Sequence, residues 1–223
     1  MDIIGLLFPK KCINCGKGEN YICEECLTRV KTVSAICAYC QKPSIDGMTH
    51  TKCLSKYKMD GFVSFWDYSG VIRKAVLGLK YKFAREISKE ISDLVVKNLK
   101  LKYGFLNSGH VLIPVPIHGS RENWRGFNQS ILIGEQIAKK MNWKFKKDVL
   151  VKTRKTSAQV DLKGNERVKN VKGVFNLNYK YKLNQTSIIL FDDVFTTGST
   201  LKEAAKVLKR SGAKKVWGLT IAR

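Results

Sequence analysis

Three absences narrow what this chain can be. No apolar run approaches the roughly 20 residues that a membrane-spanning helix needs. The apolar stretch 3–8 is too short for a secretory signal peptide and precedes no cleavage site, so we interpret it as a short N-terminal helix. The loop G-x-x-x-x-G-K-[ST] of P-loop nucleotide-binding proteins is also missing. We therefore predict a cytoplasmic protein that does not bind nucleotides through a P-loop.

Acidic residues are scarce. The 223 residues include 18 Asp and Glu against 41 Lys and Arg, which gives a net charge of +23. Such an excess favours polyanionic partners: nucleic acid, an acidic membrane surface or phosphorylated ligands. A solvated, Lys-rich surface without a specific partner is the alternative. The length suits one sizeable α/β domain plus a small module.

Cysteine is absent after residue 53, and all seven cysteines lie in residues 12–53. In a cytoplasmic protein, clustered cysteines indicate metal ligands rather than disulfides. Three C-x-x-C pairs begin at Cys12, Cys23 and Cys37, and the last cysteine belongs to an H-x-x-C pair. Zinc binds tetrahedral sets of four cysteines, or of three cysteines and one histidine.

We predict two structural zinc ions. The first set is Cys12, Cys15, Cys23 and Cys26, and the second set is Cys37, Cys40, His50 and Cys53. A crossed arrangement, with pairs exchanged between the two sites, has the same spacing. So small a segment has little apolar core, and we expect metal binding to supply its folding free energy.

The stretch S-I-I-L-F-D-D-V-F-T-T-G-S-T at 187–200 carries the chemistry. Its apolar part, 187–191, is typical of a buried strand. Asp192 and Asp193 follow, then the hydroxyl-rich loop Thr196, Thr197, Gly198, Ser199 and Thr200. Apolar residues at helical spacing come next, and Gly212 lies where that helix ends.

A loop that opens a helix is an anion site, because it presents backbone N–H groups at the positive end of the helix dipole. Gly198 lets an anion approach the backbone closely. Carboxylates repel phosphate, so Asp192 and Asp193 must serve sugar hydroxyls or Mg²⁺. These features together indicate a phosphorylated ribose. An ordinary strand-to-helix turn with a serine cap is the alternative.

The motif L-F-D-D-V-F-T-T-G-S-T resembles the phosphoribosyl pyrophosphate (PRPP) loop of type I phosphoribosyltransferases. The resemblance implies that Asp192 and Asp193 contact the ribose hydroxyls, and that residues 196–200 hold the 5′-phosphate. As an enzyme, such a protein would displace pyrophosphate at the anomeric carbon with help from Mg²⁺, and Asp192 and Asp193 would be its catalytic residues.

A second strand, V-L-I-P-V-P at 111–116, precedes a basic loop and a helix that runs to Met141. Ligands bind at the carboxyl ends of strands in open α/β sheets, so this loop can face the aspartates. We predict a pyrophosphate loop made of Pro116, His118, Arg121 and Arg125. For His118, a surface or packing role is the alternative.

The most basic part of the chain is 144–172, and 153–170 has no apolar periodicity. We interpret it as a long loop that serves as a lid or nucleic-acid arm through Arg154, Lys155 and Arg167. A solvated Lys-rich loop is the alternative. Tyr81, Phe83 and Phe127 are candidates to stack on bases. Further strands are expected at 62–68, 174–177 and 216–221, the last closing the sheet, and helices at 71–79 and 88–101.

The complete order of motifs resembles the ComF competence family. Paired cysteine motifs come first, followed by I-P-V-P-I-H-G-S-R-E-N-W-R-G-F-N-Q, T-R-K-T-S-A-Q-V-D-L-K-G-N-E-R-V-K-N-V and D-D-V-F-T-T-G-S-T. This family has a double zinc ribbon fused to a phosphoribosyltransferase-like domain. The present chain departs from it at His50, where the family usually has cysteine.

The resemblance implies an α/β fold with a type I phosphoribosyltransferase-like, parallel-rich sheet flanked by helices (58–223), after a zinc-ribbon module (1–57). It also implies a role in natural transformation, in which single-stranded DNA is handled at the inner face of the membrane beside a DNA-uptake helicase. We therefore predict a DNA-uptake accessory protein that binds PRPP, Mg²⁺ and single-stranded DNA.

A metabolic phosphoribosyltransferase acting on an unidentified amine or base is the alternative function. No motif marks a dedicated acceptor pocket, and the resemblance leaves enzymatic turnover open. We expect no internally supplied ammonia, because no glutaminase domain precedes the fold.

Overall fold

The structure is a computed structural model that describes residues 10–18, 20–79, 84–107, 109–120, 126–154 and 169–223. Its centre is a five-stranded sheet in the order β1-β7-β6-β2-β3, in which every neighbouring pair is parallel. The strands are β1 (Gly61–Val63), β2 (Val111–Pro114), β3 (Lys144–Phe145), β6 (Ser187–Val194) and β7 (Lys215–Ala222). The predicted α/β class with a parallel-rich sheet is confirmed.

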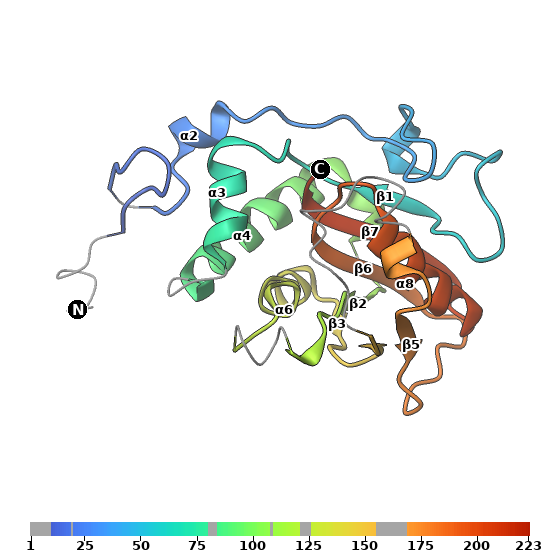
Figure 1. The fold of residues 1–223 in the computed structure, drawn as a ribbon. Helices are drawn as coiled ribbons and strands as arrows, with labels where there is room; N and C mark the ends of the chain where they lie inside the picture. Colours follow the sequence, from blue (N-terminus) through green and yellow to red (C-terminus); the bar gives the residue numbers. More distant parts are fainter. Residues whose placement is uncertain (1–9, 19, 80–83, 108, 121–125, 155–168) are drawn as a thin grey trace.

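Helices cover both faces of this sheet (Figure 1). They are α3 (Gly70–Gly78), α4 (Ala84–Lys102), α6 (Gln129–Met141) and α8 (Ser199–Arg210). Successive side chains of a strand point to opposite faces. Accordingly, Ile189 and Phe191 of β6 pack in the apolar cluster of α3, α4 and α6, whereas Ile188 and Leu190 pack in the cluster of α8.

A second, smaller sheet pairs β4 (Leu150–Lys152) with β5 (Phe175–Leu177) in antiparallel orientation. Short elements complete the described part of the chain: α2 (Glu24–Thr28) and the 3₁₀ turns η1 (Ile45–Gly47) and η2 (Gly104–Leu106). In this part, no helix combines the length and the apolar character required to cross a bilayer.

The observed elements follow the predicted ones closely, apart from the differences below and the short strands β3 and β4, which were not predicted. β1 ends at Val63, and the chain then continues in extended form, with Trp66 bridged to both Thr32 and Ala222. β6 runs on to Val194, because its last residues pair with β7. β7 follows the last helix as expected and lies inside the sheet, between β1 and β6.

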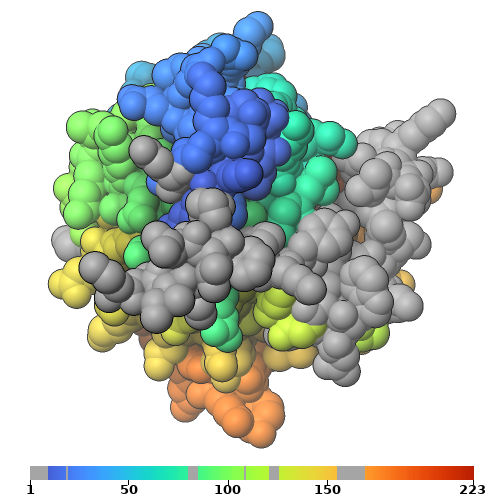
Figure 2. Space-filling model, turned by 90° about the vertical axis from the view of Figure 1, so that its left-hand side faces the viewer, coloured from blue at the N-terminus to red at the C-terminus, as the bar shows by residue number. Residues whose placement is uncertain are grey.

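The cysteine-rich region packs on the two faces of the main sheet. Cys12, Ile22 and Val30 belong to the apolar cluster of α3 and α4, and Figure 2 shows this part of the chain (blue) seated against the segments that follow it. Ile36 and Ala38 belong instead to the cluster of α8. The cysteine-rich region therefore shares its apolar contacts with the rest of the fold.

Candidate metal clusters and ligand-binding site

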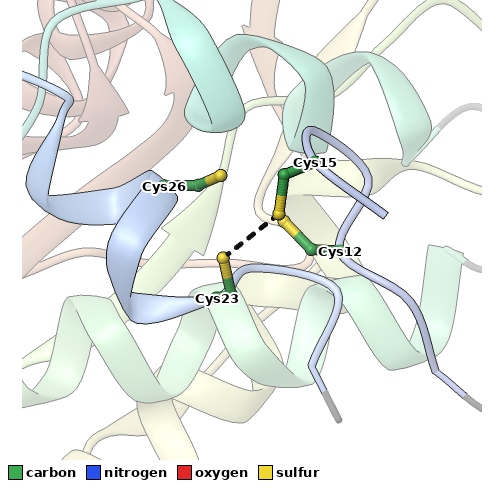
Figure 3. Close-up of side chains that lie close together, drawn as sticks. All are labelled: Cys12, Cys15, Cys23 and Cys26. Atoms are coloured by element: carbon green, nitrogen blue, oxygen red, sulfur yellow. Dashed lines mark hydrogen bonds between the residues drawn. The ribbon is translucent and has the colours of Figure 1, made fainter. Parts of the chain in front are cut away.

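The first cysteine cluster converges on one point. Figure 3 shows the side chains of Cys12, Cys15, Cys23 and Cys26 directed toward one another, and their sulfur atoms all lie within 4.8 Å of each other. The Sγ atoms of Cys15 and Cys23 are 3.7 Å apart. Tetrahedral coordination with Zn–S bonds of about 2.3 Å separates sulfur atoms by about 3.8 Å, so the cluster fits zinc.

Local backbone geometry prepares Cys12 for metal binding. Burial raises the pKa of its thiol, but hydrogen bonds from the backbone N–H groups of Cys23, Cys15 and Asn14 outweigh burial and lower this pKa to about 6. The thiolate is the form of cysteine that binds metal. Backbone N–H donors therefore lie where they stabilise a metal-bound thiolate.

The second cluster contains the histidine. The donor atoms of Cys37, Cys40, His50 and Cys53 lie within 4.8 Å of one another. Nδ1 of His50 is 3.2 Å from Sγ of Cys40, and Nε2 is 3.0 Å from the carbonyl oxygen of Pro43. A metal-bound histidine usually donates its other ring N–H to such an acceptor, which fixes the ring. This arrangement fits zinc through Nδ1.

The structure thus groups the ligands in sequence order rather than in the crossed arrangement. Burial raises the pKa of Cys37, but N–H donors from Cys40, His50 and Tyr39 outweigh it and lower the pKa to about 7. The cluster containing His50 therefore has the same kind of N–H support as the first cluster.

The two aspartates occupy the carboxyl end of β6, and both are half-buried. Oδ1 of Asp192 accepts hydrogen bonds from the Ser130 hydroxyl, at 3.4 Å, and from the Asp193 N–H, at 3.0 Å. Oδ1 of Asp193 accepts from the Val194 N–H at 2.8 Å. Burial and then the charge of Asp193 raise the pKa of Tyr68, which lies between β1 and α3 in the chain.

The surroundings of Asp192 disfavour its ionised form. Burial first and the charge of Asp193 second raise the pKa of its carboxyl well above the ordinary value, while the Asp193 N–H, Lys152 and Ser130 act in the opposite direction. Two close carboxylates of this kind favour a partner that stabilises their charge. A divalent cation or a set of sugar hydroxyls would provide it.

The predicted anion loop adopts the shape that its sequence requires. Gly198 has φ of +71° and precedes α8, which begins at Ser199 without a side-chain capping hydrogen bond. A Cβ on Gly198 would lie 2.3 Å from the ring of Phe195, so glycine is needed for both conformation and space. The hydroxyl oxygens of Thr197 and Ser199 are 2.7 Å apart.

Acid and loop residues surround one small hollow. Its lining consists of Asp192, Val194, Phe195, Thr196, Gly198, Ser199, Thr200 and Leu201. The structure therefore brings the first aspartate and the hydroxyl-glycine loop together, as the sequence predicts. Thr196 is exposed beside this hollow and Thr197 is half-buried.

The end of β2 lies beside the end of β6, because the two strands are parallel neighbours. Pro116 and His118 follow β2 at this edge, and Nδ1 of His118 lies 2.9 Å from the Ser120 hydroxyl. Arg121 and Arg125 lie outside the described residues, so their predicted pyrophosphate contacts stay predictions.

Sequence reasoning assigned no role to Asn128 and Ser130. Oδ1 of Asn128 accepts the Ser130 N–H at 2.9 Å and caps α6, while Nδ2 donates to the Val115 carbonyl at 3.2 Å. Asn128 thereby links the β2 loop to Ser130, which contacts Asp192. An asparagine directly before an apolar-periodic helix is an N-cap signal that could have revealed this position.

A cavity of about 490 Å³ adjoins the site, although no motif marked an acceptor pocket. It lies between the β2 loop, the start of α6 and β4, with apolar walls that include Phe127, Ile131 and Leu132. Lys147, Asp148 and Asn178 supply polar groups at its border. The cavity depends on long-range packing, which leaves no local pattern in the sequence.

The comparisons with known proteins agree with this architecture. A model of the double zinc ribbon domain matches residues 3–54. DNA utilization protein YhgH from Escherichia coli O6:H1 is 30% identical over 210 residues, which cover 89% of both chains. The chain belongs to the ComF family. Competence protein F from Haemophilus influenzae is 28% identical and covers 96% of this chain and 98% of its own.

ComFC from Bacillus subtilis is 24% identical over 93% of this chain and 86% of its own. Among solved structures, adenine phosphoribosyltransferase from Leishmania donovani aligns with 70% of this ComF chain and 56% of its own, at 16% identity and a TM-score of 0.37. The allosteric regulatory enzyme of purine biosynthesis aligns over 60% and 26%, at 15% identity and a TM-score of 0.39.

The predicted lid of this ComF chain is only partly described. Arg154 is exposed, and its Nη2 donates to the Lys172 carbonyl at 3.3 Å. Lys155 and Arg167 lie outside the described residues, as do Tyr81 and Phe83. Among the aromatic residues proposed to stack on bases, Phe127 is half-buried and lines the cavity described above.

Proposed function

We propose that this chain is an accessory protein of DNA uptake that binds PRPP with Mg²⁺ and binds single-stranded DNA. The observation that carries the PRPP part is the hollow shared by Asp192 and the loop 196–200 at the carboxyl end of β6. The relatives named competence protein F and DNA utilization protein support the DNA-uptake part.

In this proposal, residues 196–200 and the N-terminus of α8 hold the 5′-phosphate, because N–H groups and hydroxyls there stabilise an anion. Asp192 and Asp193 face the ribose hydroxyls and would hold Mg²⁺, which when bound neutralises charge on the pyrophosphate. Pro116, His118 and the arginines at 121 and 125 border that pyrophosphate. The ligand-binding domain would span 58–223, after a zinc-ribbon module at 1–57.

Calorimetric titration with PRPP and Mg²⁺ tests the site. We expect wild-type protein to bind and the double variant Asp192→Asn, Asp193→Asn to lose Mg²⁺-dependent binding while keeping its fold. Asp93→Asn is the matched control, because Asp93 lies on α4 and pairs with Lys140 at 2.6 Å, away from β6. Equal heats of binding for the double variant and wild type would remove the aspartates from the site.

The DNA part rests on the net charge of +23 and on the exposed Arg154 beside the basic segment. Counterion release makes such binding weaken steeply with salt, with a slope of about −0.7 per phosphate contact for single strands. We expect Arg154→Ala with Lys155→Ala to weaken binding of an oligothymidylate and to reduce the slope by about 1.4, which is about 0.7 for each of two phosphate contacts. The control is Lys180→Ala with Lys182→Ala, two exposed lysines after β5.

The absence of oligonucleotide binding by wild-type protein at low salt would defeat this part of the proposal without affecting the PRPP part. A DNA-uptake helicase at the inner face of the membrane is the protein partner that this role entails. Co-sedimentation of the chain with such a helicase, with and without single-stranded DNA, tests that association.

A metabolic phosphoribosyltransferase is the second candidate, and the cavity of about 490 Å³ beside the site favours it. Its apolar walls and few polar groups suit a planar acceptor. The reaction would displace pyrophosphate from the anomeric carbon through an oxocarbenium-like transition state, so the protein would mainly position charge. Release of pyrophosphate from PRPP on addition of a base or amine, lost in Asp192→Asn with Asp193→Asn, would establish turnover.

A further inference from the structure

The second metal cluster packs directly behind the anion loop. Cys37 and Ala38 are fully buried, and Ala38 shares an apolar cluster with Phe195 and Leu201, which flank the loop. Tyr39, between the ligands Cys37 and Cys40, packs against the same cluster. Its hydroxyl accepts a hydrogen bond from the Met59 N–H at 2.8 Å, which fixes the position of the ring.

Lys202 connects this tyrosine to the loop. Its ammonium group lies 5.5 Å from the centre of the Tyr39 ring and 5.8 Å from that of Phe195. The same nitrogen donates a hydrogen bond of 3.0 Å to the carbonyl oxygen of Thr197. A half-buried ammonium held over aromatic faces is attracted by both rings, so its position depends on where Tyr39 lies.

The hydrogen bond to Thr197 orients the loop backbone. The peptide bond between Thr197 and Gly198 is trans and planar, so its C=O and N–H point in opposite directions. Holding the carbonyl toward Lys202 therefore turns the Gly198 N–H to the other side. Gly198 and Ser199 line the hollow proposed for the 5′-phosphate, and the direction of backbone N–H groups decides how a loop binds an anion.

Phe195 ties the same loop to the first strand. Its ring lies 4.1 Å from that of Phe62, centre to centre, and close against Gly198. The ammonium group of Lys58, next to Met59, lies 4.7 Å from the centre of the Tyr39 ring and donates to the Cys53 carbonyl oxygen at 2.7 Å. A metal ligand, a tyrosine and the loop are therefore joined by consecutive contacts.

We propose that the second metal cluster positions the anion loop through Tyr39 and Lys202, with Lys202 as the positioning residue that holds the Thr197 carbonyl. Its effect on PRPP rests on the proposed function, whereas its effect on loop order does not. The first cluster, by contrast, is anchored on α4, where Glu90 accepts the N–H groups of Tyr21 and Ile22 at 3.2 and 2.9 Å.

Four variants test the link between ring, ammonium and loop. We expect Lys202→Met to weaken PRPP–Mg²⁺ binding roughly three- to thirtyfold, the range of a desolvated cation–aromatic contact, and to raise amide hydrogen exchange at 196–200. Lys202→Arg should restore both, because it keeps the cation. Tyr39→Leu should resemble Lys202→Met, whereas Tyr39→Phe keeps the ring, loses only the hydrogen bond from the Met59 N–H and should have a smaller effect than Tyr39→Leu.

Unchanged exchange at 196–200 in both Lys202→Met and Tyr39→Leu would overturn the proposal. If Lys202→Arg also raised exchange at 196–200, the positive charge at this position would not be what orders the loop. That result would overturn the proposal as well. If wild-type protein does not bind PRPP but the exchange results follow this pattern, the proposed function fails and the positioning role stands. If wild-type protein binds PRPP but neither Lys202→Met nor Tyr39→Leu changes exchange at 196–200, the proposed function stands and the positioning role fails.

Metal removal supplies an independent arm. Cys53→Ser breaks the second cluster and Cys15→Ser breaks the first, and zinc content measured for each purified full-length variant verifies the loss of one ion. We expect Cys53→Ser to raise exchange at 196–200 and Cys15→Ser to leave it within twofold of wild type. Equal exchange in the two variants would contradict a specific link to the second cluster.

Discussion

The two metal clusters have nearly the same ligands but different neighbours. The first packs with α3 and α4, where Glu90 accepts two backbone N–H groups from the ribbon. The second packs with β1, α8 and the loop before α8, with Tyr39 in contact with Lys202. The first therefore packs with the helices on one face of the sheet, and the second packs with α8 and the candidate anion loop.

This difference shows that ligand spacing specifies a metal but not what the metal supports. Both clusters would stabilise their own knuckles by binding zinc. What each contributes beyond that depends on residues that lie far from it in the sequence. The comparison can be tested by perturbing matched positions in the two halves.

Loss of a buried ligand should have the largest effect. Cys26 is 3% exposed and Cys37 is fully buried, so Cys26→Ser and Cys37→Ser each should reduce zinc from about two ions per chain to about one. Because metal binding contributes directly to folding, each should lower the free energy of unfolding by several kcal/mol. Metal analysis and thermal unfolding measure both. A variant that keeps two zinc ions would remove its cysteine from the ligand set.

Two glycines make the next contrast. Gly16 and Gly47 both have positive φ, +77° and +80°, but an added Cβ meets nothing within 4 Å at Gly16 and lies 2.0 Å from the Phe62 carbonyl oxygen at Gly47. We expect Gly16→Ala to lose about 1 kcal/mol of stability, from backbone strain alone. Gly47→Ala should lose about 3 kcal/mol or more, because β1 must also move. Equal losses by urea denaturation would contradict this account.

The next contrast in stability, between loss of Asp60 and loss of Glu90, should be smaller. Asp60 leads into β1, accepts the Val216 N–H at 2.7 Å and pairs with Lys209 at 3.0 Å, where the lysine side chain is only 10% exposed. Asp60→Ala leaves this ammonium with little water and should cost about 2–3 kcal/mol. Glu90→Ala removes one acceptor from the N–H groups of Tyr21 and Ile22 and should cost about 1 kcal/mol. A reversed order in chemical denaturation would show that the first cluster carries the stronger anchor.

Local patterns predicted much of this molecule. The C-x-x-C spacing gave both ligand sets, including His50, and apolar periodicity gave the helices 70–78, 84–102 and 129–141 within a few residues. These features depend on side chains that are close in sequence. The order of strand, acids, loop and helix was predicted for the same reason.

Long-range contacts account for what the sequence did not reveal. β6 extends through Asp192 and Asp193 because β7 pairs with it that far. The contacts of Tyr39 with Lys202, and of Ser130 with Asp192, join segments that no periodicity connects. β3 and β4 are too short, at 2 and 3 residues, to show an alternating pattern.

The last and smallest contrast concerns two acids. Asp192 lies near the carboxyl end of β6, and its pKa is raised well above the ordinary value by burial and by Asp193. A carboxyl with a raised folded-state pKa holds its proton more tightly in the folded than in the unfolded protein. Its contribution to stability is present at low pH and is lost as the pH rises through the raised pKa. The ionised carboxylate is therefore less favourable in the folded protein than in the unfolded chain.

Asp192→Asn should consequently stabilise the ligand-free protein at pH 7, by about 1 kcal/mol or some 2–4 °C in Tm, while it impairs PRPP binding. The gain should shrink as the pH falls and wild-type Asp192 becomes protonated. Asp93→Asn on α4, whose carboxylate is exposed, should change Tm by less than about 1 °C at either pH. A lower Tm for Asp192→Asn at pH 7 would mean that the carboxylate stabilises the fold, which would contradict this account.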